Sequence, residues 1–500
     1  MADSAHLPVA TPPELAISPR VVTPPKPGPR FTTRPMFTGD YHALWLFLAL
    51  GWVVSYADRT VTGPVVSWMI ANKTGFIGDA HNPAALGGLV GSIFFTGYML
   101  TQYVGGRLGD RYGHREMLVL SLIWAGLLTI TSGLVTGLIA FVAARVLTGL
   151  GEGVFYSNDR TMIINHTPST RRELGLGVVL AGLAIGMTVG LLATPYLIEW
   201  GGGLGSDAWR VPLWVLGAAS LIVAGTTWAY FRARGDRPLH LLAPLGSLIA
   251  WSAPMAAVIF VLFVIAERLR WPDWLTTLAI GALAMLVIGY VVRSIRAIGD
   301  GRQLLNRNLW IVYLSFIAVM WNLWFFSFWS VQIVKESAHS SLVSAGLTAA
   351  FSAGAGIIGF PVGGWLAARR VRRGHGRKPL AIVCAATHTV LAFAFGLSVA
   401  AGSPSLVLLG LILFVSGLFF NALQPIVHGI LGDLVPARYR GSAFGLFNLV
   451  AEIGAVASPV VSGVLRDATG SWAAGVFTAA GVMALGLVGY CIIKERLPIA

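Results

Sequence analysis

Residues 88–111 read GLVGSIFFTGYMLTQYVGGRLGDR, and residues 346–369 read GLTAAFSAGAGIIGFPVGGWLAAR. The first stretch carries no charge from Gly88 to Gly106, a length that lets a helix cross a bilayer core of about 30 Å. The two stretches align without gaps, so that the pair Gly105-Gly106 matches Gly363-Gly364. This repeat predicts two related membrane-spanning halves, with a binding site between them.

The composition of the whole chain indicates the same class. The 500 residues are 56% hydrophobic and 11% charged, whereas soluble proteins are about 45–50% apolar and about 25% charged. A soluble surface cannot absorb that excess. The sequence therefore predicts an all-α polytopic protein embedded in a lipid bilayer.

The net charge of +14 follows membrane topology rather than a nucleic-acid site. Most of the 35 lysines and arginines fall in alternate loops and at the termini. Such an excess is typical of cytoplasmic loops and places both termini in the cytoplasm. We expect a multi-pass protein of the plasma membrane, such as a bacterial inner membrane, that acts as a monomer.

Apolar runs predict two sets of six helices and one inserted pair, fourteen in all. Twelve helices with one amphipathic central loop remain the alternative. The first set is predicted at residues 41–70, 85–105, 117–137, 138–165, 175–200 and 211–231. The second set is predicted at 309–334, 343–368, 380–401, 405–432, 441–465 and 473–493, and the inserted pair at 246–266 and 275–292.

These runs define four regions. They are a proline-rich, disordered cytoplasmic tail (1–40), an N-terminal six-helix bundle (41–232), a central linker with the inserted helices (233–308) and a C-terminal six-helix bundle (309–494). The sequence holds no GxxxxGK[ST] phosphate-binding loop, so ATP is not the expected energy source. No enzyme activity, cofactor or metal site is expected.

Two opposite charges, Asp58 and Arg59, lie near the middle of the first apolar run. A charge there costs about 2.5–3.5 kcal/mol, so such residues usually face a cavity and have a function. Neighbours in a helix point about 100° apart and pair poorly with each other. Each therefore needs a partner on another helix. Arg145 and Glu152, about 10 Å apart on one helix face, are the candidates.

These four charged residues suggest two separate roles. Arg59 and Arg145 are predicted to bind a substrate carboxylate, because a guanidinium stays charged and grips bidentately. Asp58 and Glu152 are predicted to carry protons, because a carboxyl group can gain and lose a proton as the site rearranges. The alternative is a buried salt-bridge network that only holds two helices together.

The C-terminal half offers further candidates. Asn322 can bond a hydroxyl group and Trp324 can stack on a carbon skeleton, although aromatic residues in membrane helices more often serve packing. Asn421 and Gln424 are polar enough to face a cavity. Glu452 lies in the middle of an apolar run. Asp159 and Arg160, near the end of the fourth run, are expected at the membrane interface.

The turn GGRLGDRYGHR, residues 105–115, resembles a signature of the major facilitator superfamily. The matching positions are Gly106, Leu108, Asp110, Arg111, Gly113 and Arg115. In that superfamily this turn latches the cytoplasmic side, which implies a gating role. The second repeat has Ala368 in place of Asp110, so only the first latch is complete.

Longer segments resemble the anion:cation symporter family within that superfamily. They are YADRT, ARVLTGLGEG, LLNRNLW and DLVPARYRGSAFGLFNL, together with the stretch that precedes the turn. The resemblance implies a twelve-helix fold and uptake of sugar acids, other carboxylates, phosphate or acidic amino acids, usually with protons. The coupling acids and anion-binding arginines of that family fall on Asp58, Glu152, Arg59 and Arg145.

Two departures qualify the resemblance. The 233–308 insertion lies outside it, and Glu452 stands where members more often have a neutral amide. Glu452 is then either a second proton site or a group that selects against highly charged anions. The expected function is proton-coupled uptake of a small organic anion. An exporter or exchanger of another small molecule and a non-transporting membrane sensor are the alternatives.

Overall fold

The computed structural model describes residues 40–167, 172–234, 238–269, 271–297, 301–402, 405–435 and 440–495. The chain divides into the units Met1–Gly39 and Asp40–Ala500, and only the second is described below. The predicted disordered tail, residues 1–40, lies outside the described residues except for Asp40.

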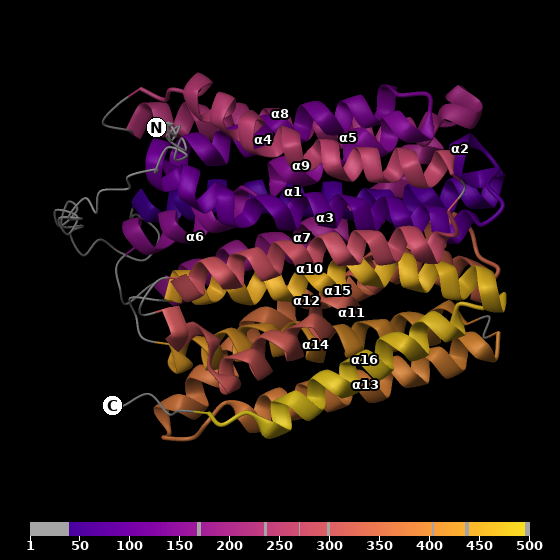
Figure 1. Cartoon of the computed structure of the whole chain (residues 1–500). Coiled ribbons are helices and arrows are strands. Elements are labelled where there is room, and N and C mark those ends of the chain that lie inside the picture. Colours follow the sequence, from indigo (N-terminus) through magenta and orange to yellow (C-terminus); the bar gives the residue numbers. More distant parts are fainter. Residues whose placement is uncertain are drawn as a thin grey trace, which may run out of the picture. The chain divides into compact units, whose positions relative to one another are not determined.

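The described residues form helices joined by short turns (Figure 1). The first half contains α1 (Asp40–Asn72), α2 (Gly75–Gly78), α3 (Pro83–Tyr112), α4 (His114–Leu134), α5 (Leu138–Glu152), α6 (Phe155–His166), α7 (Arg172–Trp200), η2 (Gly201–Asp207) and α8 (Arg210–Arg234). The centre contains α9 (Leu242–Arg268), α10 (Asp273–Ala297) and η3 (Gly301–Leu305). The second half contains α11 (Arg307–Ser337), α12 (Leu342–Arg372), α13 (Lys378–Ala400), α14 (Leu406–Leu434), α15 (Arg440–Thr469) and α16 (Ala473–Ile492).

Each predicted apolar run is helical in the structure. The fourth run, predicted as one helix over 138–165, is broken after Glu152, where Gly153 and Val154 form a turn between α5 and α6. Within the described residues, twelve helical segments are long and apolar enough to cross a membrane. These include α9 but neither α1 nor α10, so the count of fourteen stays a prediction.

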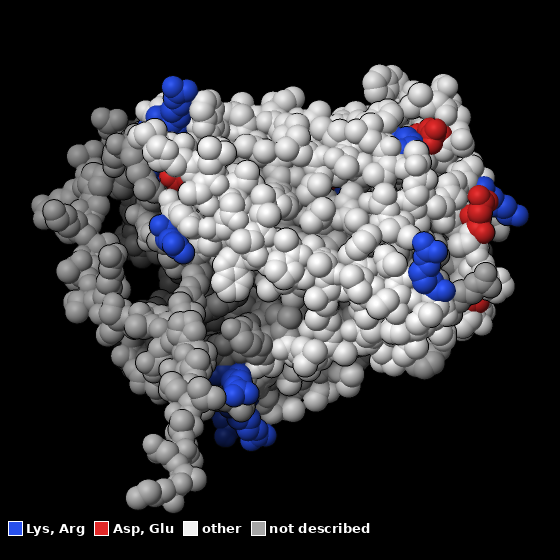
Figure 2. Space-filling view, turned by 45° about the horizontal axis from the view of Figure 1, so that its top comes forward, with Lys and Arg blue, Asp and Glu red and all other residues white. Residues whose placement is uncertain are grey.

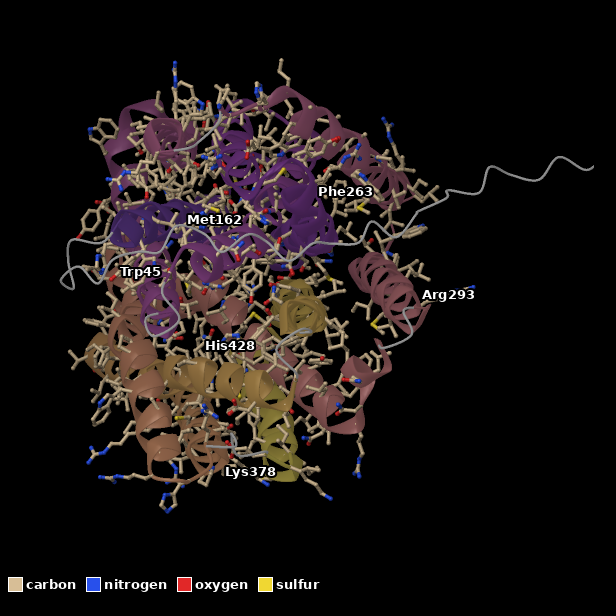
Figure 3. The ribbon with its side chains drawn as sticks, turned by 90° about the vertical axis from the view of Figure 1, so that its left-hand side faces the viewer. Trp45, Met162, Phe263, Arg293, Lys378 and His428 are labelled. Atoms are coloured by element: carbon tan, nitrogen blue, oxygen red, sulfur yellow. The ribbon has the colours of Figure 1, made fainter. Side chains whose placement is uncertain are left out.

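The helices of the two halves form two groups, as Figure 3 shows in a view along their axes. In the first group α1 packs on α7 and α4 on α8; in the second, α12 packs on α14 and α13 on α16. The groups meet along α3 and α15, α7 and α12, and α1 and α11. The inserted α9 packs on α3 and α5, while α10 packs on both α3 and α15.

Charged side chains on the face shown in Figure 2 gather toward the two ends of the helices, with uncharged side chains between them. Many large apolar side chains of the long helices are exposed, including Leu286, Val390 and Leu485 at 71%, 67% and 73%. Such a band fits a bilayer core and would be unfavourable in water.

The halves approach closely at one end of the bundle, where α3 begins and α15 ends; we call it the closed end. Asp467 of α15 accepts a hydrogen bond from the backbone N–H of Ala85, with 2.7 Å between Oδ2 and N. Nearby, Gly88 of α3 lies against the backbone of Pro459, where a Cβ atom would collide with the carbonyl group. A glycine is therefore needed for this contact between the halves.

Candidate functional site

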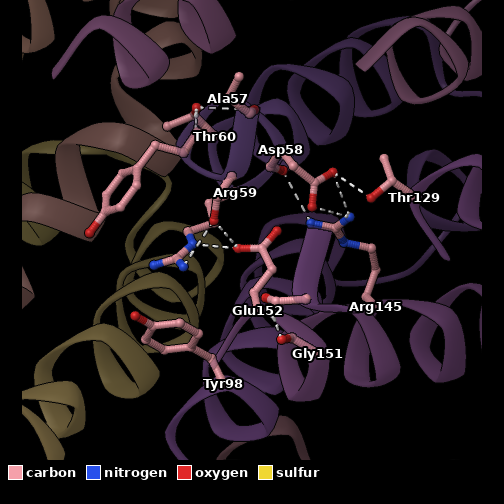
Figure 4. A network of polar contacts seen from close by, with 12 residues as sticks. Ala57, Asp58, Arg59, Thr60, Tyr98, Thr129, Arg145, Gly151 and Glu152 are labelled. Atoms are coloured by element: carbon pink, nitrogen blue, oxygen red, sulfur yellow. Dashed lines mark hydrogen bonds and ion pairs between the residues drawn. The ribbon is translucent and has the colours of Figure 1, made fainter. Parts of the chain in front are cut away.

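The charges Asp58 and Arg59 both point from α1 toward α5 and form separate ion pairs (Figure 4). Arg145 Nη1 lies 3.3 Å from Asp58 Oδ1, and Arg59 Nε lies 2.6 Å from Glu152 Oε2. All four side chains are buried. The structure thus brings together the four charges that the sequence singled out.

The Asp58 pair is held by further contacts. Arg145 Nη2 donates to the backbone carbonyl of Asp58 at 3.2 Å, and the Thr129 hydroxyl of α4 donates to Asp58 Oδ1 at 2.8 Å. The guanidinium of Arg145 also lies over the Phe94 ring, 4.8 Å from its centroid. Arg145 therefore links α5 to α1 and α3.

Aromatic rings surround the Arg59 guanidinium. Its Cζ atom lies 4.1 Å from the Tyr98 ring centroid and 4.6 Å from that of Tyr56. The Ser55 hydroxyl donates to the same Glu152 oxygen that Arg59 binds, at 2.7 Å. Arg59 Nη2 also donates to the Ser55 hydroxyl at 3.1 Å. Cation–π contacts gain strength when they are desolvated, so these rings further stabilise the buried guanidinium.

Two polar atoms of this cluster, Glu152 Oε1 and Arg145 Nε, have no hydrogen-bond partner among the residues that the structure describes. Buried polar groups are normally satisfied, and exceptions often mark a ligand, water or ion site. The cluster therefore has unused donor and acceptor capacity in a buried position.

The position of α5 depends on small residues where it meets α3. A Cβ atom at Gly149 would fall on the carbonyl of Phe94, so this glycine lets the two backbones approach. The helix then ends at Glu152, one turn further on. This local geometry holds Glu152 and Arg145 at the depth of Asp58 and Arg59.

A second polar group crosses the junction of the halves. Asn448 Nδ2 of α15 donates to Gln102 Oε1 of α3 at 2.9 Å and to Glu452 Oε1 at 3.3 Å. Within the part of the chain that the structure describes, Gln102 Nε2 and Glu452 Oε2 have no hydrogen bond of ordinary length, although the two side chains face each other. Glu452 interacts electrostatically with Arg59, which places it near the charged cluster of the other half.

The predicted C-terminal residues lie in two places. Asn322 and Asn421 line a narrow cavity of about 20 Å³, together with His388, enough for roughly one water molecule. Asn322 donates to the Ala479 carbonyl, and its Oδ1 lies 3.2 Å from His388 Nε2, so it connects α11, α13 and α16.

Trp324 also lies at the junction of the halves, but against α1 and α3, whereas Met187 and Leu191 of α7 border the cavity. Its ring stacks on Tyr56 of α1 with centroids 5.7 Å apart, and contacts Phe95 of α3 at 4.2 Å. Gln424 of α14 is buried, and its Nε2 atom has no partner. The structure therefore brings Trp324 toward the charged cluster, whereas Asn322 and Asn421 line a separate cavity.

Asp159 and Arg160 were expected at the membrane interface, and this stays a prediction. Asp159 is fully buried in the protein, and its Oδ2 accepts a 2.7 Å hydrogen bond from Trp52 Nε1. Arg160, beside it, is only partly exposed and forms an ion pair with Asp159 at 3.4 Å. The structure thus gives Asp159 a partner on α1 that the sequence did not indicate.

Sequence analysis also missed Tyr56, Tyr98 and Gln102. Tyr98 and Gln102 are four residues apart in α3, a spacing that puts both on one helix face. That spacing of polar groups in an apolar run was a usable signal. It could not show that this face meets Arg59 and α15.

The predicted gating turn joins α3 to α4. Gly113 has φ of 120°, a backbone conformation that favours glycine. Arg111 lies over the Tyr112 ring at 5.1 Å, and Gly106 packs near Ser157 of α6. Arg115 is half-buried in the first turn of α4. The side chain of Asp110 lies outside the described residues.

Among the described residues no cluster of His, Cys, Asp and Glu is arranged to hold a metal ion. Two helical halves with a buried charged cluster near their junction define a membrane transporter rather than an enzyme. The sequence profile of the Major Facilitator Superfamily matches residues 48–387 and 312–498. The chain belongs to this superfamily.

Known proteins of similar sequence are transporters of organic anions. The chain is 23% identical to the hexuronate transporter of Bacillus subtilis, covering 90% of this chain and 93% of the relative. It is 24% identical to a probable sulfoacetate transporter of Cupriavidus necator, with 94% and 96% covered. It is 23% identical to the D-galactonate transporter of Escherichia coli O6:H1, with 81% and 86% covered.

Solved structures share the fold. A peptide-transporter-family (POT) protein in complex with 5-aminolevulinic acid matches with a TM-score of 0.69 at 12% identity, covering 92% of this chain and 97% of that one. A D-xylose–proton symporter matches with a TM-score of 0.60 at 16% identity, covering 92% and 98%.

Proposed function

We propose that this transporter takes up a small organic anion, such as a sugar acid or another carboxylate, together with protons. The main observation behind the proposal is the ion pair between Arg59 and Glu152. Arg59 Nε lies 2.6 Å from Glu152 Oε2, and each side chain is 1% exposed. A proton on Glu152 removes the charge that holds Arg59. The guanidinium then becomes available to a substrate carboxylate, which couples proton binding to anion binding.

The Asp58–Arg145 pair fits the same scheme. Asp58 and Glu152 serve as proton carriers, and Glu452 is a further carboxyl group beside Arg59. Arg145 and Arg59 bind the anion from one half, and Trp324 and Gln424 contact it from the other. Asn322 and Asn421, which line their own cavity, bind the substrate from the C-terminal half.

Transport proceeds by alternating access in this proposal. The contacts at Ala85 and Gly88 hold the two halves together at the closed end. We assign the closed end to the outside of a bacterial inner membrane and both termini to the cytoplasm. The turn containing Gly106, Asp110, Arg111, Gly113 and Arg115 then closes the opposite end in the other state.

The experiment is uptake of labelled galactonate, glucuronate and other organic acids into proteoliposomes, with and without an inward proton gradient. The Arg59→Gln variant is the test, and Arg210→Gln is the matched control, because Arg210 pairs with the exposed Asp207. We expect gradient-driven accumulation of at least one acid, lost in Arg59→Gln and kept in the control.

Two other outcomes would contradict the proposal. Accumulation that is the same with and without the proton gradient, and the same in Arg59→Gln, would contradict proton coupling and the assigned site. Net efflux from loaded vesicles under a physiological gradient would instead favour the exporter alternative. Orientation is tested separately by protease access to a tag fused at the C-terminus.

A further inference from the structure

The polar group formed by Gln102, Asn448 and Glu452 joins the two halves near the charged cluster. Its side chains are buried, with 6%, 7% and 4% exposure. Asn448 uses one amide nitrogen to bind both neighbours. Among the described residues, Gln102 Nε2 and Glu452 Oε2 have no hydrogen bond of ordinary length, and these two side chains face each other across the junction.

The charges around Glu452 do not balance. Among the described residues, those that face it are Arg59 and Tyr56 of α1, Tyr98 and Gln102 of α3, Tyr156 of α6 and Asn448 on its own helix. His428 of α14 packs on the same helix through Phe444 and Phe447. Of these, only Arg59 is a permanent cation, and its nearest carboxylate is Glu152.

Counting the whole cluster gives two guanidinium groups, Arg59 and Arg145, against three carboxylates, Asp58, Glu152 and Glu452. A substrate carboxylate that binds Arg59 displaces Glu152 as its partner. Glu452 remains in place with no ion pair among those described. Any second negative charge on the substrate would then face a carboxylate in a buried site.

We propose that Glu452 is a charge filter, so that this transporter accepts monoanions bearing hydroxyl groups and rejects dianions. The inference rests on the proposed function and narrows its substrate class. A hydroxyl group both donates and accepts, which matches the carboxylate acceptor on Glu452 and the amide donor on Gln102. A second carboxylate or a sulfonate only accepts, and it repels Glu452.

The filter separates the substrates that the names of the relatives suggest. Galactonate and hexuronates carry one carboxylate and several hydroxyl groups, whereas sulfoacetate carries a carboxylate and a sulfonate. Galactonate and galactarate make a sharper pair, because they share a six-carbon polyhydroxy skeleton and differ by one carboxylate. The wild-type site should therefore bind galactonate and exclude galactarate and sulfoacetate.

The test compares galactonate, galactarate and sulfoacetate in purified protein by thermal stabilisation in detergent, and in proteoliposomes by uptake. The variant is Glu452→Gln, which keeps the size and hydrogen bonding of the side chain and removes its charge. Glu336→Gln is the matched control, because Glu336 pairs with Arg466 near the closed end.

We expect Glu452→Gln to raise the uptake of the dianions relative to that of galactonate by at least about tenfold, since like charges in a binding site cost several kcal/mol. Glu336→Gln should leave that ratio unchanged, whatever it does to rate. An unchanged ratio in well-folded Glu452→Gln overturns the filter, even if proton dependence changes. A wild-type protein that prefers galactarate overturns it as well.

Failure of the filter and failure of the proposed function give different results. If the wild type neither binds nor carries any acid in the panel, the proposed function fails and takes the filter with it. If galactonate is taken up but Glu452→Gln leaves the uptake of dianions relative to monoanions unchanged, the proposed function stands and the filter does not. If Glu452→Gln does not fold, Glu452→Asn, with a shorter amide, provides the same comparison.

Discussion

Arg59 of α1 and Glu152 of α5 form an ion pair of 2.6 Å that involves only one of the two carboxylate oxygens. Among the described residues, the second oxygen, Oε1, has no hydrogen-bond partner. A structural pair would normally satisfy every buried polar atom, because leaving one unpaired costs about 1–3 kcal/mol. The incomplete pairing therefore supports the proposed binding role over that of a purely structural bridge.

Replacing Glu152 with Gln should uncouple transport from protons. The amide keeps the contact with Ser55 but cannot hold Arg59 by charge, so Arg59 stays available to the anion. We expect gradient-driven accumulation to be lost while exchange of internal for external substrate persists. Counterflow and gradient-driven uptake in the same proteoliposomes measure the two. Retained proton-driven accumulation would remove Glu152 from the coupling scheme.

Tyr98 should matter for its ring more than its hydroxyl group. Its centroid lies 4.1 Å from the Arg59 guanidinium, and such contacts contribute about 0.5–2 kcal/mol. Tyr98→Ala should weaken substrate binding by roughly 2- to 30-fold. Tyr98→Phe keeps the ring and should stay near wild type. Equal losses in the two variants would show that the hydroxyl group is responsible.

Asp58 and Arg145 should contribute to the stability of the protein as a coupled pair. Removing one partner leaves the other buried and unpaired, which in soluble proteins costs about 3–5 kcal/mol. Asp58→Asn and Arg145→Gln should each lower the thermal unfolding temperature in detergent. The double variant should lose less than the two losses combined. Additive losses would indicate that the residues act independently.

Asp467 should hold the closed end. Its carboxylate caps the first turn of α3 from the other half through Ala85, and loss of a helix cap costs about 0.5–2 kcal/mol. Asp467→Ala should therefore shift the conformational equilibrium toward opening at this end by roughly 2- to 30-fold. Spin labels at the exposed His81 and Ala468, in a background lacking the native cysteines, measure the distance across it.

The control for that experiment is Asp207→Ala. Asp207 is 55% exposed on its side chain and pairs with Arg210 in the same half. It should leave the distance distribution unchanged. If both variants give the wild-type distribution, Asp467 does not hold the two halves together.

The sequence by itself determined the class of this protein and the position of its helices. Apolar runs long enough to span a bilayer predicted every long helix, because hydrophobic length is a local property. The cost of burying Asp58 and Arg59 pointed to a functional cluster, and the seven-residue spacing of Arg145 and Glu152 identified their partners. The gapless repeat at residues 88–111 and 346–369 predicted two halves.

Only the tertiary structure decided which faces meet. The pairing of Asp58 with Arg145 and of Arg59 with Glu152, rather than the reverse, depends on how α1 and α5 rotate against each other. The burial of Asp159 against Trp52 depends on how α6 packs on α1. Gln102 reached Asn448, 346 residues away, because α3 and α15 cross at the junction of the halves. Contacts between distant helices depend on packing, which no local pattern of residues contains.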